Sequence, residues 1–175
     1  MNAQQSEHLA RVRHLRESFA SANERLVARL RGASDEAASR SMTGGWTPAQ
    51  IGWHVATVTT RFANVMSGDL AAAVPLPEGY VERSWAEVAA SIPAQLQATE
   101  SISPPAVVSR HDAISALEAS GMRMARALDT LTLERGSRLG LTNRIVGTIT
   151  LYQVGEWATA HVARHNRQAK RALGQ

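Results

Sequence analysis

The chain of 175 residues contains no cysteine, which excludes disulfides, thiolate metal sites and cysteine nucleophiles. Any thiol chemistry must therefore use a sulfur that a second substrate supplies. Aromatic residues make up only 5% of the chain and do not alternate with basic residues, as a surface for single-stranded nucleic acid requires. The net charge of +4 indicates nucleic-acid binding only weakly. We expect no nucleic-acid partner.

Long apolar runs are also missing. No uninterrupted run approaches the roughly 20 residues that span a bilayer. The polar N-terminus, MNAQQSEHLARVRHLRE, lacks the apolar core of a signal peptide. We therefore expect a cytoplasmic protein without a membrane partner. A chain of this length can bury a core without disulfides or metals, and a single domain over residues 1–175 is predicted.

Four long segments show helical periodicity, and none shows the alternation of a strand. In the first, apolar residues recur at steps of three and four until Gly32 ends it. The second begins at Thr47, which forms a capping box with Gln50, and Pro48 suits its first helical position. The last begins near Thr150, whose spacing to Gln153 repeats the capping box. The predicted long helices cover about residues 4–31, 48–66, 110–133 and 150–173. The sequence thus predicts an all-α fold.

The connections between these helices differ in length. Residues 32–45 are small and polar and are predicted to form a loop, and residues 134–147 interrupt the helical pattern. Residues 67–110 are rich in proline, and the capping-box pattern Ser84-Trp85-Ala86-Glu87 predicts a short helix near residues 85–100. A connection of this length suits a crossover from one end of a helical bundle to the other.

Three histidines on apolar stripes are the candidate site. His161 and His165 are spaced i, i+4, so both imidazoles leave one face of the last helix, on the stripe that predicts its inward side. His54 lies beside the apolar stripe of the second long helix. Buried imidazoles need polar partners, and a metal ion would satisfy all three. Three nitrogen ligands leave positions open for water or substrate, as in reactive metal sites.

The spacing alone leaves two interpretations open, core or surface histidines on the one hand and metal ligands on the other. The zinc protease motif is excluded, because Val162 stands where that motif has glutamate. The nitrogen donors do not choose among Zn, Ni, Fe and Mn as the one divalent ion.

The two histidine segments resemble a known family. The segment WTPAQIGWHVATVTTRF resembles the second-helix signature of the DinB-like superfamily, which includes YfiT-type thiol transferases, and Trp46, Thr47, Pro48 and His54 match it in order. The segment TLYQVGEWATAHVARHNRQ resembles the family's last helix, a HxxxH pair followed by glutamine. The matching residues there are His161, His165 and Gln168.

The resemblance implies a four-helix bundle in up-down-down-up order, with a long connection between the second and third helices. It also implies a divalent metal held by His54, His161 and His165. Characterised members of the family transfer low-molecular-weight thiols or use a thiol in isomerisation. We therefore expect a metal-dependent thiol transferase acting on a small molecule. A metal-dependent hydrolase and a non-catalytic bundle with a binding or assembly role are the alternatives.

Other residues have two interpretations each. Trp53 and Trp157 are candidates for a substrate pocket or for the core, and Arg61 for an anionic substrate or a solvated face. Gln168 is a candidate to orient a ligand or to face solvent. A homodimer is compatible with such a bundle, although no apolar stripe specifies one. The residues expected at the surface or as packing only are His8, His14, His111, Glu156, Arg164 and Trp46, and helix-dipole compensation explains the basic cluster Arg164, Arg167, Lys170 and Arg171.

Overall fold

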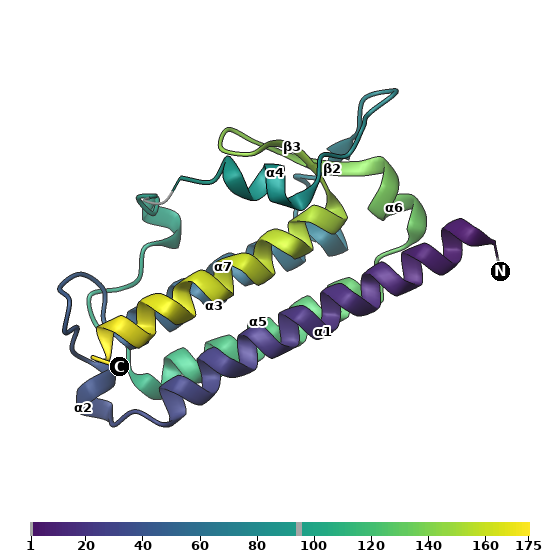
Figure 1. Ribbon diagram of the computed structural model, residues 1–175. Coiled ribbons are helices and arrows are strands. Elements are labelled where there is room, and N and C mark those ends of the chain that lie inside the picture. Colours follow the sequence, from purple (N-terminus) through teal and green to yellow (C-terminus); the bar gives the residue numbers. More distant parts are fainter. Residues whose placement is uncertain (1, 94–95) are drawn as a thin grey trace.

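The computed structural model describes residues 2–93 and 96–175 and is mostly helical (Figure 1). Four long helices form its body, in which α1 and α3 each pack against both α5 and α7. The bounds are Ala3–Arg31 for α1, Pro48–Ser67 for α3, Arg110–Asp129 for α5 and Leu151–Ala172 for α7. These are the four segments that hydrophobic periodicity predicts. In the described part of the chain, no helix is both long and apolar enough to cross a membrane.

Capping boxes begin two of these helices where the sequence predicts them. The Thr47 hydroxyl accepts a hydrogen bond from the Gln50 amide at 3.2 Å, and the Gln50 side chain accepts one from the Thr47 amide at 3.0 Å. Thr150 and Gln153 repeat this exchange at 3.2 Å in both directions. Each box satisfies backbone donors that the first helical turn leaves without partners, and so defines the first residue of its helix.

A small antiparallel sheet contradicts the expectation that no strand forms. Strand β2 (Leu139–Asn143) pairs with β3 (Gly147–Thr150) in a hairpin and with the two-residue strand β1 (Val74–Pro75). The helix α6 (Leu133–Arg138) precedes the hairpin, and α5 ends at Asp129 instead of continuing to residue 133. Periodicity missed the sheet because its strands are short and β1 pairs with a segment far along the chain.

The crossover between α3 and α5 runs along the helices and is attached to them. It contains α4 (Trp85–Ala90), shorter than the helix predicted near 85–100, and the 3₁₀ turn η1 (Glu100–Ile102). The Gln50 side chain donates to the carbonyls of Pro105 and Ala106, at 2.9 and 3.0 Å. The start of α3 and the end of the crossover therefore hold each other in place. The connection after α1 contains one further short helix, α2 (Asp35–Ala38).

The core lies between the four long helices and is aliphatic. Its largest fully buried apolar side chains are Leu26, Leu30, Ile51, Val55, Met66, Val88, Leu117, Met124, Leu128, Ile149 and Leu151. Close packing of such side chains fixes the spacing of the helices. The inward face of α7 therefore lies at a fixed distance from α3. That distance decides whether histidines on the two helices can meet.

His8 is buried, contrary to the expectation of a surface residue. Only 7% of it is exposed, and its Nδ1 lies 2.7 Å from the Tyr152 hydroxyl. The Tyr152 hydroxyl and the His8 ring are hydrogen-bonded, and burial raises the pKa of Tyr152, so the phenol stays protonated. The Arg11 guanidinium lies 4.3 Å from the Tyr152 ring centre, and Glu156, also expected at the surface, lies 3.5 Å from Arg11. This cluster borders a cavity of about 1010 Å³ that none of the three candidate histidines lines.

Gly136 of α6 makes room for this cluster. A Cβ at position 136 would lie 2.3 Å from Cζ of Tyr152 and 2.6 Å from its hydroxyl oxygen. We expect Gly136→Ala to displace the ring, break the bond to His8 and lower the free energy of unfolding by about 1–3 kcal/mol. Urea unfolding measures this change.

Gly32→Ala is the matched control, because a Cβ there would lie 3.4 Å from its nearest neighbour and the backbone has a φ of −75°. We expect that variant to be as stable as the wild type or slightly more stable. A Gly136→Ala protein with wild-type stability would contradict the close packing of α6 on Tyr152.

Candidate metal centre

His54 lies in the second turn of α3 and faces α7. Its side chain is buried, with 4% exposed. Its Nδ1 donates to the carbonyl of Ile102 at 2.8 Å, so η1 of the crossover holds the ring. Arg61 lies two turns further along α3. It donates a hydrogen bond to the Ser101 hydroxyl at 3.1 Å and so attaches the same 3₁₀ turn to the helix. The backbone of the crossover thus sets the orientation of a side chain on α3.

His161 and His165 lie one turn apart on α7, with ring centres 4.4 Å apart. The Nδ1 of His165 donates to the side-chain oxygen of Gln168 at 2.7 Å. The Nδ1 of His161 is buried and has no hydrogen-bond partner among the described residues. The inward stripe predicted for the last helix is therefore correct, and it carries both imidazoles to α3.

The three imidazoles converge. The Nε2 atoms of His54 and His161 lie 3.2 Å apart, and one nitrogen of each of the three rings lies within 4.8 Å of the others. The ring centre of His54 is 5.1 Å from that of His161 and 4.8 Å from that of His165. Side chains that are 107 residues apart in the sequence thus meet between α3 and α7, as the metal-ligand interpretation requires.

The hydrogen bonds determine which nitrogens are free. A carbonyl oxygen only accepts, so the Nδ1 atoms of His54 and His165 carry the protons in their bonds to Ile102 and Gln168. In the neutral rings, the Nε2 atoms then present lone pairs. A neutral His161 can offer them at most one proton, so hydrogen bonds among the three rings cannot satisfy both lone pairs.

Burial keeps these rings neutral. It lowers the pKa of His165 to about 4, and the neighbouring His54 adds to the effect while the bond to Gln168 opposes it. Burial also lowers the pKa of His161 well below its ordinary value, and that of His54 below it in spite of the Ile102 bond. Neutral imidazole is the form that binds metals, so near pH 7 the rings need not lose protons to do so.

The donor set fits a metal ion. Bonds of about 2.0–2.1 Å at tetrahedral angles separate ligand nitrogens by about 3.3 Å, close to the 3.2 Å between His54 and His161. A metal ion between the rings would take Nε2 of His161 as its third ligand. The Nδ1 of His161 would then be the outer nitrogen, and it has no hydrogen-bond partner among the described residues. The three histidines that the sequence singled out are therefore the group suited to hold the ion.

A cavity of about 560 Å³ opens beside His165. Trp46 forms part of its wall, and the Trp46 ring centre lies 4.8 Å from that of His54. The residues that line it are Thr43, Trp46, Leu96, Gln97, Arg164, His165, Gln168 and Arg171. A small molecule in this cavity would meet the edge of the histidine cluster.

The other candidate residues have different positions. Gln168 contacts His165 and lines the cavity. Trp157 is buried in the core with its ring centre 5.2 Å from that of Phe62, and Trp53 packs partly buried against the core. Neither tryptophan is among the described residues that line the cavity beside His165. Arg61 is exposed and is bonded to the crossover rather than to the cavity.

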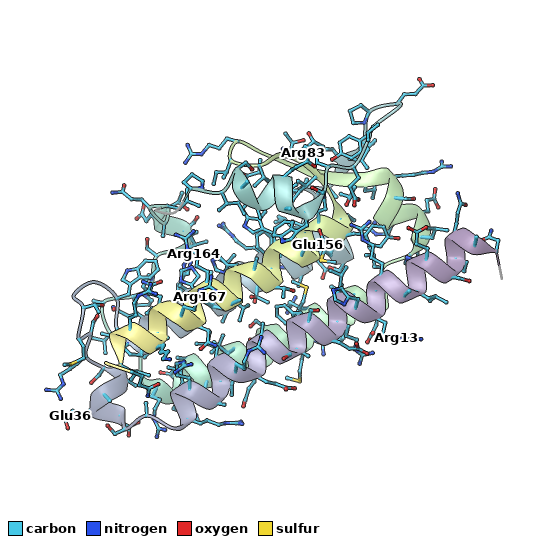
Figure 2. The ribbon with its side chains drawn as sticks, in the orientation of Figure 1. Arg13, Glu36, Arg83, Glu156, Arg164 and Arg167 are labelled. Atoms are coloured by element: carbon cyan, nitrogen blue, oxygen red, sulfur yellow. The ribbon has the colours of Figure 1, made fainter. Side chains whose placement is uncertain are left out.

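Sequence reasoning missed part of the site. It treated Trp46 as a packing residue and Arg164 as a surface residue, and it explained Arg171 by the helix dipole alone, yet all three line the cavity. In Figure 2, Arg164 extends from α7 toward the crossover, where its Nη1 donates to the Pro93 carbonyl at 3.1 Å. The i, i+3 spacing of Gln168 and Arg171 on the histidine stripe was the available signal. The Ile102 carbonyl gave no signal in the sequence, because every residue type has a backbone carbonyl.

The comparison with protein families agrees with the site. A family model described as the DinB superfamily matches residues 18–169, which include all three histidines. The chain therefore belongs to this superfamily. Neither the search of curated proteins nor that of solved structures finds a match.

We expect His161→Ala to abolish metal binding, because two remaining imidazoles hold a divalent ion much less tightly. Elemental analysis of protein purified without a metal-affinity column should find about one divalent ion per wild-type chain and almost none in the variant. His54→Ala and His165→Ala should behave alike. His111→Ala, which changes an exposed histidine on α5, is the control. Unchanged metal content in His161→Ala would rule out the site.

Gln168→Ala should weaken metal binding by about 10–100-fold, since His165 loses the acceptor that fixes its proton and its orientation. Gln168→Glu keeps an acceptor oxygen and should retain most of the affinity. Competition with a chromogenic chelator gives the dissociation constants, and urea unfolding shows whether each variant is folded. If the alanine variant binds as tightly as the wild type, Gln168 has no role in positioning His165.

Proposed function

We propose that this member of the DinB superfamily is a metal-dependent enzyme that uses a low-molecular-weight thiol at an ion held by His54, His161 and His165. The observation that carries the proposal is the convergence of three neutral imidazoles beside a cavity large enough for a small molecule. Protein ligands that leave coordination positions open are typical of reactive rather than structural metal sites.

A bound divalent ion supplies a Lewis acid that lowers the pKa of a thiol or of water. The chain's own residues orient the site. Ile102 and Gln168 hold two of the imidazoles, and Trp46 covers one side of His54. In the proposed transfer, the thiol loses its proton to solvent, and its sulfur forms a bond to an electrophilic carbon. The leaving group departs from that carbon with the bonding electron pair.

The composition of the cavity favours a thiol over water as the nucleophile. None of the described residues that line it is an aspartate or glutamate, so a general base for water is not at hand there. A thiol has a pKa of about 8.5, against 15.7 for water, and needs far less assistance to ionise. The absence of cysteine from the chain requires that the sulfur come from a second substrate.

We further infer that the four long helices form one four-helix bundle domain in up-down-down-up order. The packing of α1 and α3 against both α5 and α7 supports this arrangement, and the crossover provides the long connection that it needs. A free thiol substrate stays reduced in the cytoplasm, which favours that location. A homodimer remains a proposal that no apolar stripe specifies.

A panel of thiols tests the function. Protein loaded with Zn, Ni, Fe or Mn is mixed with 1-chloro-2,4-dinitrobenzene and, in turn, with each low-molecular-weight thiol, and product formation is followed by absorbance. We expect turnover above the uncatalysed rate with at least one thiol, and its loss in His161→Ala, because the thiol must be ionised at the three histidines.

His111→Ala is the control and should keep full activity. Product that forms without added thiol would favour the hydrolase. No reaction with any thiol, together with a tightly bound ion that has no exchangeable water, would overturn the proposal in favour of a structural metal.

A further inference from the structure

The cavity beside His165 has a pronounced charge. Among the described residues that line it, Arg164 and Arg171 are the charged ones, and both are cations. They lie two turns apart on α7, with His165 and Gln168 between them on the same face. The end of a helix carries about half a negative charge, which two guanidinium groups outweigh. The cavity therefore attracts anions.

Arg164 lies close to the histidines. It directly precedes His165 on α7 and lines the same cavity. The bond to the Pro93 carbonyl fixes its guanidinium at the cavity wall, between α7 and the crossover (Figure 2). A group held there would lie next to the metal ligands rather than at the outer rim.

Arg171 lines the cavity and is exposed. The ion pairs that the described residues form do not include it. Arginine presents planar donors that match the two oxygens of a carboxylate. An exposed guanidinium is thus available to an acidic ligand, because the described residues that line the cavity include no carboxylate side chain.

Part of the cavity lining is apolar. Trp46 and Leu96 supply apolar surface, and the ring of Trp46 extends to His54. A ligand with a short carbon chain between an acidic end and a second functional group would place that chain on Trp46. Its acidic end would lie at the arginines and its other end at His165.

We propose that the cavity selects thiols that carry a carboxylate, with Arg171 and Arg164 binding the carboxylate while the sulfur lies at the three histidines. This inference rests on the proposed function and adds the substrate class to it. It assigns to Arg171 a role in substrate selection, separate from metal binding.

Three thiols of similar size test the selectivity: thioglycolate, which is anionic, 2-mercaptoethanol, which is neutral, and cysteamine, which is cationic. The three thiols differ in pKa, and the charge of the metal acts on each of them. The value of kcat/KM is therefore compared between the wild type and a variant for one thiol at a time. We expect Arg171→Gln to lower kcat/KM for thioglycolate about tenfold, since a hydrogen-bonded charge is lost. The values for the other two thiols should change little.

Arg167→Gln is the matched control, because Arg167 is an exposed arginine on the same helix that does not line the cavity. It should keep the wild-type order of the three thiols. Equal losses for all three thiols in Arg171→Gln, or no loss, would overturn the proposal.

A second measurement separates this inference from the proposed function. Succinate is titrated into the metal-free protein by calorimetry, which requires neither thiol chemistry nor a bound ion. We expect binding to the wild type and to Arg167→Gln, weakened about tenfold in Arg171→Gln. Succinate binding without any thiol turnover would overturn the thiol function and leave the anion site standing. Equal succinate binding by all three proteins would overturn the anion site.

Discussion

The convergence of three neutral imidazoles between α3 and α7 is the constraint on which the site depends. Imidazoles on apolar stripes lose hydration, and each must recover a partner for both ring nitrogens. Ile102 and Gln168 satisfy the outer nitrogens of two rings and thereby direct the inner lone pairs toward one point. The geometry of the centre is thus a result of hydrogen bonds made outside it, together with the aliphatic packing that sets the separation of the helices.

Hydrophobic periodicity and capping were sufficient to predict the long helices. The capping boxes at Thr47 and Thr150 act locally, so the sequence alone defines where those helices begin. The sheet was beyond such reasoning, because β1 and β2 are far apart in the sequence and are too short to show alternation. The burial of His8 was missed for a similar reason. Its partner Tyr152 lies 144 residues away, and nothing in the neighbourhood of His8 indicates it.

The candidate ligands were predictable because spacing, stripe and family resemblance all pointed to the same three histidines. The residues around these histidines were harder to predict. Arg164 and Arg171 had an adequate explanation as helix-dipole partners, and only the three-dimensional structure shows that both line the cavity. A charged residue near a helix end has several physical reasons to be there, whereas a histidine pair on an inward stripe has few.

The crossover contributes differently from the helices. It gives His54 a backbone carbonyl at Ile102 and Arg164 another at Pro93, while its Leu96 and Gln97 side chains line the cavity. Main-chain acceptors persist whatever side chains the segment carries. Side-chain changes in this stretch can therefore reshape the cavity beside His165 while the two main-chain acceptors keep their places. Such a division lets the shape of the cavity vary along a lineage by drift in one connecting segment, without first disturbing the histidine cluster.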